Sequence, residues 1–159
     1  MKKAEHVLSL VIKTIVTILL LALTVLVTYT VILRYVFNSG VPAAEELVRY
    51  LFVWTAFFGI VLGVQGKSHM NLTFLHDSFP KLRPYLKGIY YVCSYVFWSV
   101  IAVYGYKFTA HAATARSTLL PITLNYVYAA VPICAVLSVI FVTFQLIHEF
   151  IDKKEEENT

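Results

Sequence analysis

The sequence predicts an all-α integral membrane protein with four transmembrane helices. Of its 159 residues, 59% are hydrophobic and only 14% are charged, and the mean hydropathy of +0.74 is far above that of a soluble domain. Four stretches contain no Asp, Glu, Lys or Arg, and each is close to or above the roughly 20 residues that a helix needs to cross the hydrocarbon. Because these stretches fill most of the chain, we expect one membrane domain over residues 1–159. The stretches are residues 14–33, 50–66, 88–106 and 117–148.

The first helix is expected over about residues 11–37. Lys2 and Lys3 before an apolar stretch resemble the start of a signal peptide, but the stretch reaches Arg34 without a small-x-small cleavage site, so we expect it to be retained. Four threonines of this helix fall within one stripe roughly 80° wide at 100° per residue. We expect a packing face there, since threonines bond across helices or back to their own backbone. The stripe consists of Thr14, Thr17, Thr24 and Thr28.

A turn and a charged helix start come next. Residues 38–40, Asn-Ser-Gly, are a turn signal, and Pro42 suits the first turn of a helix. Glu45 and Glu46 follow where the positive end of the helix dipole favours carboxylates. Arg49 lies four and three residues further on, so one helix face can carry a carboxylate–guanidinium cluster. The cluster is either a cap that fixes where the helix enters the bilayer or a docking site for another protein.

The second helix is expected over about residues 42–65, and it carries small residues at four-residue spacing. Thr55, Gly59 and Gly63 form this small-xxx-small seam. Such a seam lets a neighbouring backbone come close. The neighbour is either another helix of the chain or a partner protein, and the motif does not distinguish them.

The third and fourth helices are expected over about residues 84–110 and 126–150, with interfacial segments in the connections before them. Residues 67–87 form the main polar connection, in which apolar residues recur at helix-like spacing between prolines. His69 and His76 are interpreted as interfacial hydrogen-bonding groups rather than metal ligands, because they lie seven residues apart with little supporting chemistry. We expect no metal site in the chain.

The distribution of basic residues predicts that both termini lie in the cytoplasm. If four helices alternate, nine Lys and Arg residues fall on the side of the termini and four on the other side, as the positive-inside rule requires of a cytoplasmic face. The Glu45–Arg49 segment then lies outside the cytoplasm. The four basic residues on that outer side are Arg34, Arg49, Lys107 and Arg116.

The predicted spans lack the residue types on which several classes of membrane protein depend. No Asp, Glu, Lys or Arg lies in the middle of a predicted helix, whereas a self-sufficient ion-coupled carrier is expected to hold one there. Cys93 and Cys134 fall in apolar runs and act as small hydrophobes, and nothing in the pattern predicts a cofactor, an enzyme or a nucleic-acid surface. The sequence therefore favours a helper subunit that positions another protein. The alternative is a standalone, homo-oligomeric carrier or channel with its pore along the Gly59/Gly63 seam.

Several motifs together resemble the small membrane subunit of tripartite ATP-independent periplasmic (TRAP) transporters. The resemblance covers about residues 34–150 and is most specific between Arg34 and Arg49. It rests on the following features: the Arg-Tyr-Val-Phe-Asn end of the first helix, the Glu-Glu-Leu-x-Arg-Tyr start of the second, Gly59 and Gly63, Lys67 with His69, and the Pro-Ile segments at Pro121 and Pro132.

The resemblance implies a three-component uptake system in the bacterial inner membrane. A periplasmic binding protein would deliver an organic-acid anion, a separate large multi-helix subunit would hold the substrate and sodium sites, and this chain would be the scaffold. Overall similarity favours sialic acid slightly over C4-dicarboxylates. Glu45, Glu46 and Arg49 would lie at the periplasmic boundary near a partner, and His69 at the cytoplasmic boundary. Arg34 and Arg116 are expected to hold anionic lipid headgroups between subunits.

Overall fold

The computed structural model describes residues 2–78 and 83–157, with side chains described for residues 5–66 and 88–147. In this part of the chain all named elements are helices. Four of them are long and apolar enough to cross a membrane, and the spans are Glu5–Tyr35, Pro42–Gly66, Gly88–Thr114 and Asn125–Ile147. The prediction of an all-α protein with four membrane spans is confirmed. The helices are α1 (Lys2–Tyr35), α2 (Pro42–Ser78), α3 (Arg83–His111), η1 (Ala112–Thr114), α4 (Asn125–Tyr128) and α5 (Ala130–Glu157).

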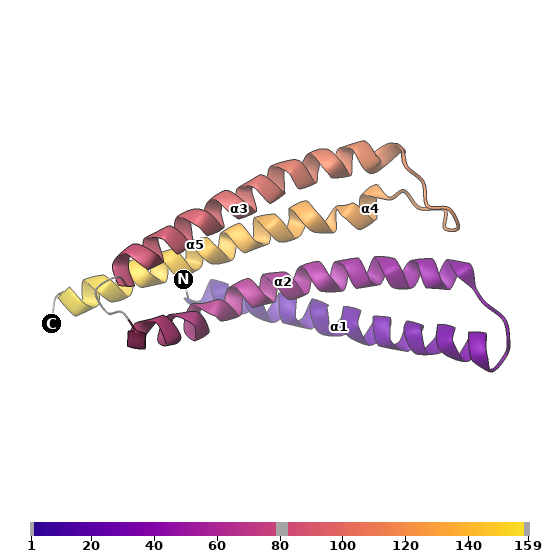
Figure 1. The fold of residues 1–159 in the computed structure, drawn as a ribbon, viewed down its shortest axis with the longest axis horizontal. Helices are drawn as coiled ribbons and strands as arrows, with labels where there is room; N and C mark the ends of the chain where they lie inside the picture. Colours follow the sequence, from indigo (N-terminus) through magenta and orange to yellow (C-terminus); the bar gives the residue numbers. More distant parts are fainter. Residues whose placement is uncertain (1, 79–82, 158–159) are drawn as a thin grey trace.

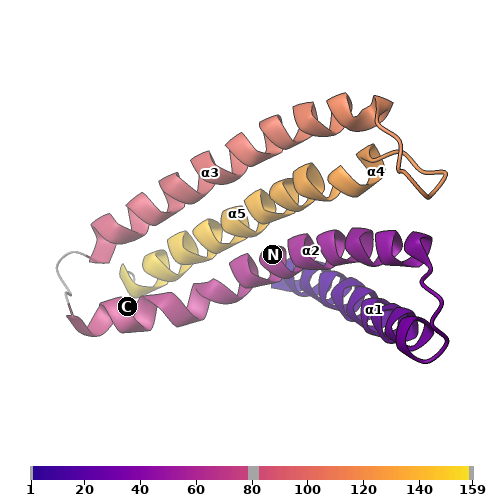
Figure 2. The same cartoon turned by 45° about the vertical axis from the view of Figure 1, so that its right-hand side comes forward.

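The four long helices stand in a row, in the order α1, α2, α5, α3 (Figures 1 and 2). Two antiparallel hairpins, α1 with α2 and α3 with α5, pack against each other through α2 and α5. The buried share of each span falls from 39% in α5 and 22% in α2 to 6% in each of α1 and α3. The two outer helices therefore leave most of their length to lipid or to another protein.

The core lies where α1, α2 and α5 meet. Ile12 from α1, Phe58 and Val61 from α2, and Cys134 and Phe141 from α5 are buried there in one apolar cluster. Between membrane helices this contact is stabilised by close packing more than by exclusion of water, because the surrounding lipid is as apolar as the side chains. Cys134 acts as a small core residue, as its apolar setting predicted, whereas Cys93 is exposed on α3.

α3 and α5 approach each other closely at Gly105. A Cβ atom at this position would lie 2.9 Å from Val131 Cγ1 and 3.4 Å from the Pro132 backbone nitrogen. Thr109, one turn further along α3, donates a hydrogen bond to the Tyr128 carbonyl at 3.1 Å. Only a residue without a side chain fits Gly105, so this glycine sets the spacing of the second hairpin.

The expected seam of α2 makes no such contact inside the chain. An ideal Cβ atom at Gly59 or Gly63 would meet nothing within 4 Å. Thr55 is buried, and its hydroxyl donates to the Leu51 carbonyl of its own helix at 2.8 Å. Thr55 is thus covered by this chain, whereas Gly59 and Gly63 have open space beside them among the described residues. A partner protein that packs against these two glycines stays a prediction.

The threonines of the α1 stripe show one of the two hydrogen-bonding modes expected of them. Each hydroxyl donates to a carbonyl one turn earlier in α1, at 2.8 to 2.9 Å. The four side chains are exposed among the described residues, so a packing face toward a partner protein stays a prediction. Because the hydroxyls are satisfied locally, the stripe presents methyl groups to its surroundings and is compatible with lipid.

Three helices extend further than predicted. α1 begins at Lys2 rather than at about residue 11, although it ends at Tyr35. α2 continues past residue 65 to Ser78, and α5 continues past residue 150 to Glu157. The apolar residues that recur in the second half of α2 at helix-like spacing explain why the helix continues through the predicted polar connection. Pro80 lies outside the described residues, and α3 begins at Arg83 with Pro84 in its first turn, where the missing N–H has no helical partner to lose.

Candidate docking site at the turn between α1 and α2

The turn between α1 and α2 is short and closed by backbone hydrogen bonds. Asn38 has a φ of 50°, the left-handed conformation that asparagine tolerates better than most residues. The Ser39 amide donates to the Leu33 carbonyl at 3.1 Å and so satisfies one of the last carbonyls of α1. At the other side the Ala44 amide donates to Val41 at 3.0 Å, which starts α2. The turn brings the last turn of α1 beside the first turn of α2.

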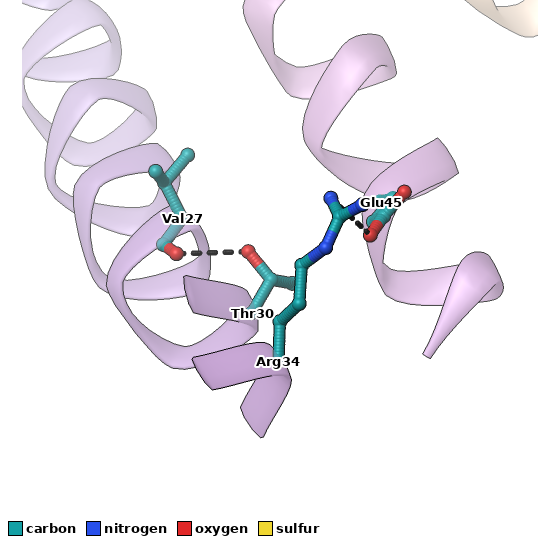
Figure 3. Close-up of polar contacts among 4 residues, drawn as sticks. All are labelled: Val27, Thr30, Arg34 and Glu45. Carbon is teal, nitrogen blue, oxygen red and sulfur yellow. Dashed lines mark hydrogen bonds and ion pairs between the residues drawn. The ribbon is translucent and has the colours of Figure 1, made fainter. Parts of the chain in front are cut away.

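Arg34 and Glu45 form an ion pair across this turn. The Arg34 Nη1 atom lies 3.6 Å from the Glu45 Oε1 atom. Figure 3 shows the two side chains pointing toward each other. The side chains are 65% and 41% exposed, so water and salt screen the pair. Arg34 also lies at the negative end of α1, where a cation is favoured. The pair aligns the two helix ends and contributes little to stability.

Glu46 is a hydrogen-bond acceptor for three groups. It accepts from the Ser117 hydroxyl at 2.6 Å, from the Leu119 amide at 3.1 Å and from the Tyr50 hydroxyl one turn along α2. Ser117 and Leu119 belong to the connection between α3 and α5. The carboxylate therefore fastens this connection to the start of α2, which joins the two hairpins at this end of the row.

The connection itself is a small hairpin-like loop. The Ser117 amide donates to the Ile122 carbonyl and the Leu124 amide to the Ala115 carbonyl, each at 3.0 Å. The Leu120 amide adds a bond of 3.1 Å to the Ser117 hydroxyl. Its apolar tip is exposed, with Leu119 at 52%. The loop was expected to rest in the membrane interface, and its exposed leucine is compatible with that place.

The predicted cluster of Arg49 with Glu45 and Glu46 does not form. Arg49 is exposed and makes no hydrogen bond or ion pair with the described residues. The reason is competition: Arg34 approaches Glu45 from α1, and the loop donors occupy Glu46. Since both carboxylates are engaged within the chain, Arg49 has no acidic partner among the described residues near the start of α2.

The other predicted site residues are less constrained. Arg116 is exposed, and its backbone forms an isolated bridge with Thr123. His69 lies within α2, but its side chain is outside the described ones, so its role stays a prediction.

Sequence reasoning missed the partners of Glu46. Tyr50 lies four residues after Glu46, a spacing that signals a side-chain pair on a helix. Ser117 gave no such signal, because 71 residues separate it from Glu46.

Comparison with known proteins identifies the family of this chain. The model of the DctQ component of tripartite ATP-independent periplasmic transporters matches residues 23–152. The chain belongs to the DctQ family. The resemblance seen in the sequence is thus confirmed, and the protein is a component of a transporter, not an enzyme.

Several relatives of this DctQ protein are similar over different parts of the chain. A TRAP small permease protein of Haemophilus influenzae is 44% identical over 62 residues, which span 39% of this chain and 38% of the relative. A second one from this organism is 26% identical over 132 residues, 82% of this chain and 80% of the relative. The sialic acid small permease protein SiaQ of Vibrio cholerae is 28% identical over 122 residues, 76% of this chain and 70% of SiaQ.

A fourth relative has a different size. The sialic acid TRAP permease protein SiaT of Haemophilus influenzae is 28% identical over 105 residues, which are 65% of this chain but only 17% of SiaT. The DctQ chain thus matches a small part of a much longer permease. Membership of the TRAP family implies a large permease subunit and a periplasmic binding protein as partners.

Proposed function

We propose that this DctQ subunit is the stationary scaffold of a TRAP permease. It supports a large membrane subunit during sodium-coupled, binding-protein-dependent uptake of an organic-acid anion. The observation that carries the proposal is the open row of helices, because α1 and α3 offer long apolar surfaces to a neighbour. A neighbour that packs along such a surface gains contact area without a rearrangement of the row.

The buried polar groups of the row support a scaffold rather than a carrier. Each one among the described side chains is hydrogen-bonded within the chain. The Ser138 hydroxyl donates to the Cys134 carbonyl, and the amide group of Gln145 donates to α2. A solute that crossed the membrane along this chain would need polar groups free to bind it. The sodium and substrate sites therefore belong to the large subunit.

The substrate is proposed to be an organic-acid anion, with sialic acid slightly ahead of C4-dicarboxylates. Support for sialic acid comes from SiaQ and SiaT, both named for that cargo, at 28% identity each. The binding protein and the large subunit are expected to select the substrate.

The orientation with both termini in the cytoplasm places the turn between α1 and α2 in the periplasm. The nine-to-four distribution of basic residues supports it. The docking surface proposed there consists of Arg34, Glu45, Glu46 and Arg49. Because the other three side chains bond within the chain, Arg49 is the group that meets an acidic partner. Arg34 and Arg116 are proposed to contact lipid headgroups, and His69 to lie at the cytoplasmic boundary.

Purification from the native membrane in mild detergent tests the scaffold. The expected result is a stoichiometric large subunit bound to the DctQ chain. Liposomes that hold both subunits should take up sialic acid only with the binding protein and a sodium gradient, and a C4-dicarboxylate serves as the second substrate. Uptake by liposomes that hold the DctQ chain alone would overturn the proposal in favour of a standalone carrier.

A further inference from the structure

A second polar junction joins three helices at the end of the row opposite Glu46. The side-chain amide of Gln65 on α2 donates to the Ser9 hydroxyl on α1 at 2.6 Å. The side-chain amide of Gln145 on α5 donates to the Val64 carbonyl on α2 at 2.8 Å and lies 3.5 Å from the Gln65 carbonyl. Ser9 is 4% exposed and Gln145 is 5% exposed. All three side chains lie close to the ends of their apolar spans, and the burial of Ser9 and Gln145 shields these bonds from water.

The topology explains why α2 and α5 need such a junction. Within each hairpin the helices are antiparallel, so the connection between them limits how far they can slide. α2 and α5 instead run in the same direction and are joined only through the whole of α3, as Figure 1 shows. No turn fixes their register. Their shared core of Phe58, Val61 and Phe141 is apolar and therefore non-directional.

The hydrogen bond from Gln145 is directional and can therefore fix the register of α5 against α2. If α5 slid along α2 by one turn, the Gln145 amide would leave the Val64 carbonyl and lie unpaired among apolar groups, which is costly in a membrane. The bond from Gln65 to Ser9 carries the same restraint to α1. Glu46 already fastens α2 to the loop between α3 and α4 at the other end. The row is thus restrained at both ends.

We propose that Ser9, Gln65 and Gln145 form a clamp that fixes the register of α1 and α2 against α5 and makes the two hairpins one rigid unit. The clamp holds the row in one register, whichever partner covers the outer helices. Loss of the Gln145 bond should change the register of the helices more than it changes folding. In Gln145→Leu the Val64 carbonyl still accepts its hydrogen bond within α2, and the bond from Gln65 to Ser9 remains.

The two native cysteines provide the test. Cys134 is buried in the core between α2 and α5, whereas Cys93 is exposed on α3 away from this contact. The full chain in its membrane is treated with a membrane-permeant maleimide, and the labelling rate of each cysteine is measured by mass spectrometry. Gln145→Leu should raise the rate at Cys134 severalfold and leave the rate at Cys93 and the amount of chain in the membrane unchanged. Unchanged protection of Cys134 would overturn the clamp.

A matched control separates the clamp from a general loosening of α5. Thr143 lies two residues before Gln145 and is hydrogen-bonded to Tyr95 of α3, on the other side of α5. Thr143→Val should therefore leave Cys134 protected, and equal labelling of Cys134 in both variants would contradict the proposal. If Gln145→Leu fails to accumulate, Gln145→Asn takes its place, since its amide is one carbon too short to reach Val64. Protection of Cys134 in that variant would also overturn the clamp.

Discussion

Glu46 on α2 and Ser117 in the loop after α3 are hydrogen-bonded at 2.6 Å, although 71 residues separate them. The contact joins two hairpins that meet mainly through α2 and α5. Because the Leu119 amide binds the same carboxylate, the acid fixes both the position and the shape of the loop. A single glutamate at the start of a membrane span thus organises the end of the row that carries the proposed docking surface.

Replacing Glu46 should release this loop. In Glu46→Ala the Ser117 hydroxyl and the Leu119 amide lose their acceptor, so the amide hydrogens around Leu119 are expected to exchange with solvent faster. Hydrogen exchange measured by mass spectrometry on the detergent-solubilised chain checks this. Glu45→Ala is the matched control, because that carboxylate pairs with Arg34 on α1 instead. Equal exchange in Glu46→Ala and the unaltered chain would rule out the fastening role.

The Arg34–Glu45 pair should matter little for stability. Both side chains are largely exposed at a distance of 3.6 Å, and exposed pairs of this kind contribute about 0–1 kcal/mol. A double-mutant cycle with Arg34→Ala and Glu45→Ala, followed by denaturant unfolding, is expected to give a coupling energy in that range that falls as salt is added. A coupling energy well above it would indicate that the pair is shielded from water.

The sequence was sufficient for the features that depend on local patterns. The four spans, the start of α2 at Pro42 and the core role of Cys134 follow from apolar runs, proline geometry and the polarity around the thiol. The partners of Glu46 and Gln145 did not follow, because Ser117 and Val64 lie 71 and 81 residues away in the chain. Contacts at such separations depend on the order of helices in the row, which periodicity does not reveal.

The glycines also show that local sequence patterns do not reveal which helices are neighbours. Gly59 and Gly63 form the spacing motif, yet the close contact within the chain occurs at Gly105, which belongs to no motif. A small-residue motif indicates that a helix has a smooth face but not which neighbour covers it. Pattern recognition therefore found a plausible partner-binding face and missed the glycine that holds α3 against α5.

Gly105 should be the glycine on which the isolated chain depends. In Gly105→Ala the new methyl group would lie 2.9 Å from Val131 Cγ1, and overpacking of this kind typically costs about 1–3 kcal/mol. We expect a lower midpoint of thermal or denaturant unfolding for the purified chain. An unchanged midpoint would show that α3 moves away from Val131 without cost.

Substitutions at Gly59 and Gly63 should affect assembly with the large subunit rather than the stability of the isolated chain. Gly59→Leu and Gly63→Leu add side chains where nothing of this chain lies within 4 Å of the Cβ position. The isolated chain is therefore expected to keep its stability, while the yield of complex with the large subunit falls because the partner helix can no longer come close. The measurement is the amount of large subunit recovered with each variant. Full recovery with both variants would show that the partner packs elsewhere.

Arg49 should bind an acidic group on a partner protein. Its guanidinium is exposed and has no described partner, whereas Glu45 and Glu46 are engaged by Arg34 and Ser117. A guanidinium forms strong charge-assisted hydrogen bonds with carboxylates, so a carboxylate on the large subunit or the binding protein is the expected neighbour. Arg49→Glu should weaken the recovery of a partner strongly, Arg49→Ala less, and Arg49→Lys least because the positive charge is retained. Lys107→Glu, which reverses an exposed charge near the end of α3, is the control. Equal losses for Arg49→Glu and Lys107→Glu would indicate a diffuse basic surface, and no loss for either would overturn the role of Arg49 in docking.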